Sequence, residues 1–318
     1  MSSMPTSKSH SPSLLRIIGS GLTIALLIYL LSQQGWEAIW LAVQNISWPV
    51  LALTFAIMIV SRLAVSARWH VLLRSANMEI SLADSTKITF AGLFATNFLP
   101  TTIGGDVVRL AGAIQKNIDG TIAAASLIAD RLVGLTGMAL AIPFGIPSII
   151  TYIQHLSFYP ALNTPWTFSF TAIPPKIWWR KIWDKGKHIM YRLYEALKFW
   201  VTQPTALLKA LAITSVHMVC FFSIISLLFH GLGEDIPLYQ VAGLYSFVYI
   251  ITLLPISING YGLQEISISY VFSELAGVSF ANGVAVALLF RTLTMVASLP
   301  GALFLPGILP DAKAKEID

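Results

Sequence analysis

The sequence predicts an all-α, polytopic membrane protein, and three observations predict this class. First, 56% of its residues are hydrophobic and only 11% are charged, too few to cover the surface of a soluble domain. Second, its apolar stretches are about 18–25 residues long, the length of a helix that crosses a bilayer. Third, they lack the alternation of the roughly ten-residue strands that build a membrane barrel. We expect about seven or eight transmembrane helices.

The first half of the chain predicts a series of apolar helices. The run after residue 13 predicts an uncleaved first transmembrane helix, because no small-x-small cleavage site follows it. A second helix is expected from about Trp48 to Trp69, and a third from near Ile88 to a break at Pro100. A short helix follows, from about Val107 to Gln115. Residues 121–150 contain two prolines and predict a kinked helix followed by part of another.

The second half begins with a basic segment and continues with three apolar helices. Lys176–Trp200 interleaves lysines and arginines with tryptophans, which predicts an amphipathic helix at the cytoplasmic interface; a solvated linker is the alternative. The apolar helices are expected near Ala206–Phe229, Gln240–Ile258 and Ala281–Leu305.

Two parts of the chain resemble each other at an offset of 155 residues. Leu99, Pro100, Ile103 and Gly105 face Leu254, Pro255, Ile258 and Gly260. Each part also has the same order: an apolar helix, a Pro/Gly break, a short helix, and a helix that carries an arginine. We therefore expect one transmembrane domain, residues 14–305, with repeat units at about 48–150 and 206–305 and the basic segment, about 176–204, between them. The tails, 1–13 and 306–318, are expected to be polar, the first of them disordered.

The two breaks predict a polar cavity within the membrane. Unpaired backbone at membrane depth is tolerated only where protein buries it or a watery cavity meets it. The free N–H groups at the start of a half-helix favour anionic groups. The residues expected to form the breaks are Pro100, Gly104 and Gly105 in the first unit, and Pro255, Asn259, Gly260 and Gly262 in the second.

Three pairs of charges fall in these apolar segments, where each ionisable group costs roughly 2.5–3.5 kcal/mol on insertion scales. Asp106 and Arg109 lie one helical turn apart, and two interpretations stay open: the pair only stabilises the break, or Asp106 caps the half-helix and Arg109 binds a lipid phosphate. Asp130 and Arg131 are neighbours and are expected to have different partners. Arg131 is the preferred phosphate ligand because guanidinium binds phosphate bidentately.

The third pair, Glu265 and Arg291, lies in the second unit. Two further arginines are expected near the end of a helix. Arg291 is the expected counterpart of Arg131, and Glu265 either balances Arg291 or contacts a cationic headgroup. Purely structural salt bridges are the alternative for these groups. Arg62 and Arg68 are expected to extend to the cytoplasmic interface rather than into a site.

The sequence lacks the motifs of several kinds of catalytic, cofactor and metal site. The chain has no P-loop, no GxSxG and no HExxH motif, so we expect no catalytic residue and no cofactor. His217 has no metal-ligating neighbour at helical spacing, and no metal site is expected. Cys220 is expected to be a packed core thiol. The basic residues lie beside apolar, Trp-rich segments, which favours anionic lipid over nucleic acid as a partner.

The motifs "NFLPTTIGGDVVRL", "AASLIADRLVGL", "LPISINGYGLQE" and "FRTLT" resemble the lysylphosphatidylglycerol synthase/flippase transmembrane family over about residues 14–305. The resemblance implies a lipid-headgroup site made of Asp106, Arg109, Asp130, Arg131, Glu265 and Arg291. Two departures are Asn259, where glycine is usual, and a shortened, proline-rich region after Ile150.

This resemblance implies a flippase-like protein of the bacterial inner membrane that binds or moves an anionic-headgroup lipid, without the family's soluble synthase domain. Alternating access of the two units would move the lipid. Two alternatives stay open. One is an enzyme of lipid-linked sugar, polyprenyl-lipid or hopanoid metabolism with Asp106 or Glu265 as base. The other is a scaffold that holds a lipid-synthesising enzyme through Lys176–Trp200.

Overall fold

A computed structural model of the chain describes residues 46–98, 104–157, 198–200, 202–253 and 260–308, together with Gln44. The expected first helix, both termini, most of the basic segment and the break residues Pro100, Pro255 and Asn259 lie outside the described residues. The described part is built from helices and contains no strand, as the all-α prediction requires.

Four described helices are long and apolar enough to cross a membrane: α3 (Trp48–Ser75), the rod Gly120–Gln154, α9 (Pro204–Gly231), and Phe280–Leu303. Two shorter pairs lie between them: α4 (Leu82–Phe98) with α5 (Gly104–Gln115), and α10 (Leu238–Thr252) with α11 (Leu263–Ala276). The chain is therefore a multi-pass helical protein by length and composition, and the count of seven or eight crossings stays a prediction.

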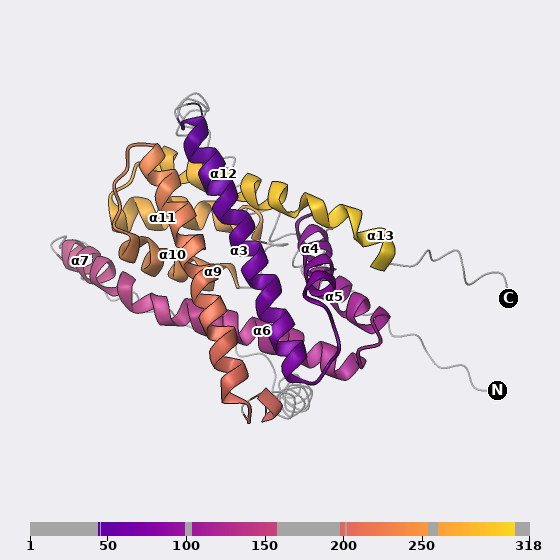
Figure 1. Cartoon of the computed structure of the whole chain (residues 1–318). Coiled ribbons are helices and arrows are strands. Elements are labelled where there is room, and N and C mark those ends of the chain that lie inside the picture. Colours follow the sequence, from indigo (N-terminus) through magenta and orange to yellow (C-terminus); the bar gives the residue numbers. More distant parts are fainter. Residues whose placement is uncertain are drawn as a thin grey trace, which may run out of the picture.

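The rod Gly120–Gln154 shows what the two prolines do. It consists of α6 (Gly120–Ala141), the 3-10 turn η1 (Ile142–Gly145) and α7 (Ile146–Ser157). Pro143 has no N–H to donate to the preceding turn, so the helix tightens to 3-10 geometry there. The backbone stays right-handed helical at Ile142 and Ile146, and one nearly continuous rod results (Figure 1). The expected kinked pair is thus a single rod with a tight turn inside it.

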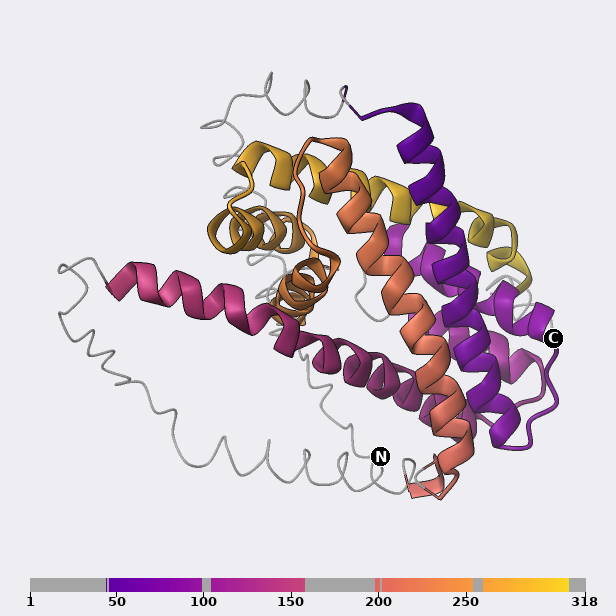
Figure 2. The same ribbon diagram turned by 60° about the vertical axis from the view of Figure 1, so that its left-hand side comes forward.

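Helices α3 and α9 pack along each other and run in opposite directions (Figures 1 and 2). Each is 28 residues long and has a proline in its first turn. Ser61 Oγ and His217 Nδ1 lie 2.7 Å apart, and each is the fourteenth residue of its helix. The two helices therefore cross at their midpoints.

The helices of each half of the chain pack against the corresponding helices of the other half. The turn η1 packs against α10, and the second 3-10 turn, η4 (Leu299–Leu303), packs against α4. The last helices do likewise: α7 contacts α11, and α13 (Leu305–Ile308) contacts α5. Helix α6 contacts α9, while α12 (Phe280–Ser298) contacts α3. The two halves of the chain thus make matching contacts with each other.

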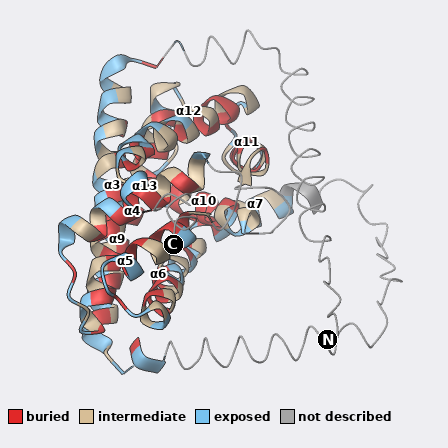
Figure 3. Cartoon of the chain, turned by 90° about the vertical axis from the view of Figure 1, so that its right-hand side faces the viewer, coloured by how far each residue is buried: buried red, intermediate tan, exposed pale blue. Residues whose placement is uncertain are grey.

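Buried residues gather where helices face one another, and apolar residues also cover the outside (Figure 3). The largest buried cluster joins α9, α10, α11 and α12, and the ring centroids of Phe229 and Phe272 lie 4.8 Å apart in it. Outward-facing Leu63, Leu208 and Val219 are exposed in the bare protein, as expected for side chains that meet lipid. Cys220 is half-buried, so the expectation of a core thiol was wrong.

Close backbone contact between η1 and α10 gives a stability prediction. A Cβ at Gly243 would overlap the backbone of Gly145 and Phe144, and backbone cannot move aside as a flexible side chain can. We expect Gly243→Ala to lower the free energy of unfolding by about 1–3 kcal/mol through overpacking. The matched control is Gly307→Ala, also in a helix, where a Cβ meets nothing within 4 Å. Thermal unfolding of both variants in detergent checks this; equal midpoints would contradict the packing described here.

Candidate functional site

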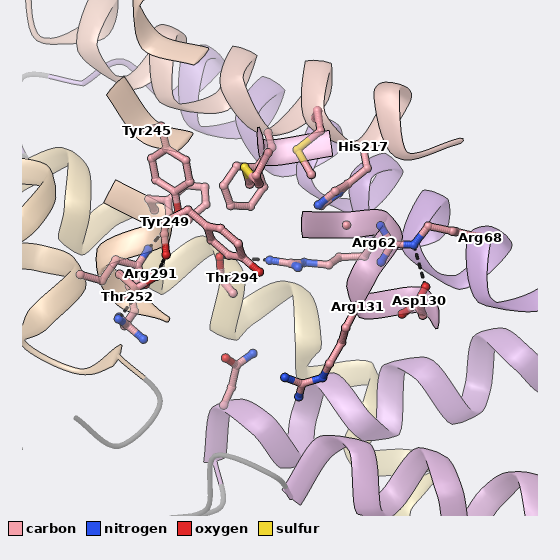
Figure 4. Close-up of a pocket in the computed structure, with 17 residues that line it drawn as sticks. Arg62, Arg68, Asp130, Arg131, His217, Tyr245, Tyr249, Thr252, Arg291 and Thr294 are labelled. Atoms are coloured by element: carbon pink, nitrogen blue, oxygen red, sulfur yellow. Dashed lines mark hydrogen bonds and ion pairs between the residues drawn. The ribbon is translucent and has the colours of Figure 1, made fainter. Parts of the chain in front are cut away.

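A cavity of about 350 Å³ lies beside the crossing of α3 and α9, and side chains from both halves of the chain line it. Its charged lining consists of four arginines and one carboxylate: Arg62, Arg68, Arg131, Arg291 and Asp130 (Figure 4). Aromatic and apolar side chains complete the wall, among them Tyr245, Tyr249, Phe221 and Phe290. The cavity is thus a cationic pocket inside an apolar helical protein.

Asp130 lies at the centre of the first group of charges. Only 2% of this residue is exposed, and its carboxylate accepts from Arg68 Nε at 2.6 Å and from Arg109 Nη2 at 3.1 Å. The guanidinium of Arg109 also lies 4.5 Å from the centre of the Trp69 ring. Two buried cations therefore share one buried carboxylate.

Asp106 is the third residue of α5 and joins this group to Arg131. Its position in the first turn of the helix favours a negative charge. Asp106 binds Arg131 closely and lies 3.8 Å from Arg109, so the expected pairing within α5 is the weaker of its two contacts. The Arg131 side chain is 60% exposed to the open volume. It therefore has donor groups left for a ligand.

Gly104 and Gly105 have a different role from the one expected. Both lie in the first turn of α5, and neither has a positive φ. A Cβ at Gly105 would lie 2.6 Å from the carbonyl oxygen of Gly92, so glycine lets α5 lie directly against α4. The short helix was expected to start after the glycines, whereas they form its first turn and allow it to pack closely; the break before them, residues 99–103, lies outside the described residues.

The second break matches its prediction better. Gly260 and Gly262 have φ values of +71° and +77°, a conformation that favours glycine. The N–H of Gly262 donates to Glu265 Oε2 at 2.8 Å, and Glu265 binds Arg291 closely. Arg291 also donates to Gln264 Oε1 at 2.9 Å and to the Gly260 carbonyl at 3.3 Å. Glu265 is thus the counter-ion of Arg291, one of its two predicted roles, and Arg291 holds the turn in place.

The two acid–arginine pairs occupy equivalent places in the helices. Asp106 is the third residue of α5 and Arg131 the twelfth of α6; Glu265 is the third residue of α11 and Arg291 the twelfth of α12. In both halves the acid at the start of the short helix binds the arginine of the next helix. The match of Arg131 with Arg291 was predicted, but the constant offset missed the match of the acids, because it sets Asp106 against Tyr261.

Sequence reasoning also misplaced Arg62 and Arg68. Both are buried and line the cavity, so the expectation that they reach the interface was wrong. The expected helix ended near Trp69, whereas α3 continues to Ser75 and leaves both arginines deeper in the protein. Arg68 binds Asp130, while Arg62 Nη2 donates to Thr294 Oγ1 at 3.3 Å. The polar residues Thr54, Ser61 and Ser66 on the same helix were the available signal for a buried polar face.

Among the residues that the structure describes, no group of three or more His, Cys, Asp and Glu side chains could hold a metal ion. His217, on the cavity wall, is paired with Ser61 instead. The three carboxylates Asp106, Asp130 and Glu265 are all held by arginines. Guanidinium groups around an enclosed volume favour a phosphate or another oxyanion.

The chain is similar to a known family and to a curated membrane protein. The family described as the lysylphosphatidylglycerol synthase TM region matches residues 16–301. A UPF0104 membrane protein of Archaeoglobus fulgidus is 23% identical over 284 residues, which cover 81% of this chain and 86% of that protein. The matched span includes all six predicted site residues and both breaks.

Proposed function

This chain belongs to the lysylphosphatidylglycerol synthase transmembrane-region family, and on that premise we propose that it binds an anionic lipid headgroup and moves it between leaflets. The observation that carries the proposal is the cationic pocket, where four arginines and one carboxylate line one cavity. Charged groups at membrane depth are costly and mark substrate pathways by default. A phosphate headgroup is the ligand whose charge and geometry match this lining.

An inverted repeat supports movement in addition to binding. We infer that α3–α7 and α9–α13 are related by a pseudo-two-fold axis through the crossing of α3 and α9. The equal lengths of α3 and α9, their opposite directions, the reciprocal packing and the two matched ion pairs support this relation. Inverted repeats around a midplane site let a transporter open alternately to either side by rocking one unit against the other.

The roles of the site residues follow from their contacts. Arg131, half of whose side chain is free, would bind the headgroup, while Asp130 would hold Arg68 and Arg109 at the pocket wall. Glu265 and Arg291 would keep the second break in shape as the units move. The acyl chains would stay in the bilayer, so that only the polar headgroup passes through the cavity.

Translocation in vesicles tests the proposal. The protein is reconstituted with nitrobenzoxadiazole-labelled phosphatidylglycerol or phosphatidylcholine, and dithionite then bleaches the outer leaflet. We expect the protein to expose the inner pool of the anionic probe faster than protein-free vesicles do, and to act much less on the zwitterionic probe. Equal rates with and without protein for both probes would contradict transport.

The bacterial inner membrane remains the proposed location. The alternatives of an enzyme and of a scaffold remain less favoured. A general base at Asp106 or Glu265 would have to leave its arginine first. The scaffold segment Lys176–Trp200 lies outside the described residues except for residues 198–200, so no contact of it favours a partner enzyme. Its last residue, Trp200, donates to Ser75 Oγ at 3.1 Å, which ties the segment to the end of α3.

A further inference from the structure

Arg62 lies at the centre of the protein, where its charge cannot reach water along the helix. It is the fifteenth of the 28 residues of α3, about 20 Å from either end at 1.5 Å per residue. An extended arginine side chain is much shorter than that distance. Arg62 is 9% exposed and follows Ser61, which marks the crossing of α3 and α9. Figure 4 shows its side chain reaching across the pocket toward Thr294.

Arg62 also differs from its neighbours in having no counter-ion among the described residues. Arg68, Arg109, Arg131 and Arg291 each bind a carboxylate. Among the described residues, no Asp or Glu oxygen lies within ion-pair distance of Arg62, and its Nε is buried without a hydrogen-bond partner. Its Nη2 donates to the hydroxyl of Thr294, which is neutral. A buried cation of this kind is costly unless an anion pairs with it.

The formal charges around the cavity give the size of that deficit. Five arginines, Arg62, Arg68, Arg109, Arg131 and Arg291, face three carboxylates, Asp106, Asp130 and Glu265, which leaves +2. One unbalanced positive charge arises because Arg68 and Arg109 share the single carboxylate of Asp130. The other is the charge of Arg62. A phosphate monoester carries about −1.5 to −2 at neutral pH, whereas a phosphodiester carries a single negative charge. A dianion would balance the pocket.

We propose that Arg62 binds the phosphate of a lipid phosphate monoester and makes the pocket prefer that dianion to a phosphodiester lipid. This inference rests on the proposed function, because it names the substrate class of the same pocket. The positive charge of Arg62 is balanced by the second negative charge of a phosphate monoester. The largely exposed side chain of Arg131 supplies further N–H donors from α6. A free phosphate ion has the same chemistry, and the apolar and aromatic wall favours a phosphate that carries a lipid chain.

Binding of four probes to the purified protein in detergent at pH 8 tests the proposal by titration calorimetry. The probes are decyl phosphate, methyl decyl phosphate, decanol and inorganic phosphate. We expect decyl phosphate to bind at least about tenfold more tightly than the other three. Arg62→Gln should weaken its binding about 10- to 100-fold, the effect of a lost charged hydrogen bond, and should abolish the preference over the methyl ester. Arg74→Gln, an exposed arginine on the same helix, should change neither.

Thermal unfolding without ligand separates binding from a structural role. Because Arg62→Gln removes an uncompensated buried charge, the melting temperature should stay the same or rise, and a variant that does not fold would overturn the proposal. Unchanged preference in Arg62→Gln, or equal binding of both esters by the natural protein, would overturn it while leaving lipid binding intact. Equal affinity for inorganic phosphate would overturn the lipid assignment. If neither ester binds, the proposed function fails as well.

Discussion

Replacing Asp130 by Asn is expected to lower the free energy of unfolding by about 3–5 kcal/mol. The carboxylate is buried and holds two buried cations, Arg68 and Arg109, at 2.6 and 3.1 Å. Asparagine has nearly the same shape but no charge, so the two guanidinium groups would face each other without an anion. Loss of one partner of a buried ion pair is costly because it leaves the other charge unpaired. Unfolding midpoints in detergent measure the effect.

The exposed pair between Asp84 and Lys116 provides the control for Asp130. These groups are 2.9 Å apart, but they lie near the surface of α4 and α5. Asp84→Asn removes the same charge from a similar contact, and exposed pairs contribute only about 0–1 kcal/mol. A loss of stability in Asp130→Asn no larger than in Asp84→Asn would contradict a buried charge network.

Replacing Arg131 by Gln is expected to reduce lipid translocation at least about tenfold, to near the rate of protein-free vesicles. The Arg131 side chain lines the cavity and is 60% exposed, so it can donate to a headgroup that enters. Loss of a charged hydrogen bond to the lipid weakens binding by about 1.5–3 kcal/mol, and each 1.4 kcal/mol is a factor of ten. The fold should persist, because Asp106 is itself partly exposed and keeps Arg109 nearby.

The dithionite assay with labelled phosphatidylglycerol measures the Arg131 effect, with Arg74→Gln as the control. Arg74 carries the same substitution at an exposed position on α3. Arg291 is a poorer choice, because its loss would leave the buried Glu265 without a counter-ion and confuse transport with stability. Translocation at the natural rate by a folded Arg131→Gln variant would contradict a headgroup role for this residue.

The helices were largely predictable, and their ends were not. Apolar runs placed both ends of α9 and the start of α10 within a few residues, since a long run of apolar side chains is a strong signal, but α10 ends at Thr252 and not near Ile258. The end of α3 was placed near Trp69 because two arginines nearby resemble an interface, yet the helix continues to Ser75. A positive charge in a sequence does not reveal whether it faces water or a carboxylate elsewhere in the chain. Arg68 faces Asp130, which is 62 residues away.

The candidate site was predictable only in part: Asp130, Arg131 and Arg291 line the cavity, whereas its lining residues Arg62 and Arg68 were missed. All six predicted residues form ion pairs, in the combinations Asp106–Arg131, Asp130–Arg109 and Glu265–Arg291. For Asp106 the sequence could suggest only the partner one turn away, Arg109 in the same helix. The packing of α6 against α5 places Arg131 closer to Asp106 than Arg109 is. The role of Gly105 was missed for the same reason, as its neighbour Gly92 lies on another helix.

The lipids that remain bound to the protein provide the most direct test of a headgroup pocket. The protein and an Arg62→Gln/Arg131→Gln double variant are extracted from one host in polymer-bounded native discs, and the lipids of each are quantified by mass spectrometry. We expect the natural protein to be enriched, relative to the surrounding membrane, in lipids that carry an ionised phosphate without a compensating positive charge. The double variant should lose that enrichment. The same lipid composition in both discs and in the bulk membrane would contradict an anionic-headgroup site.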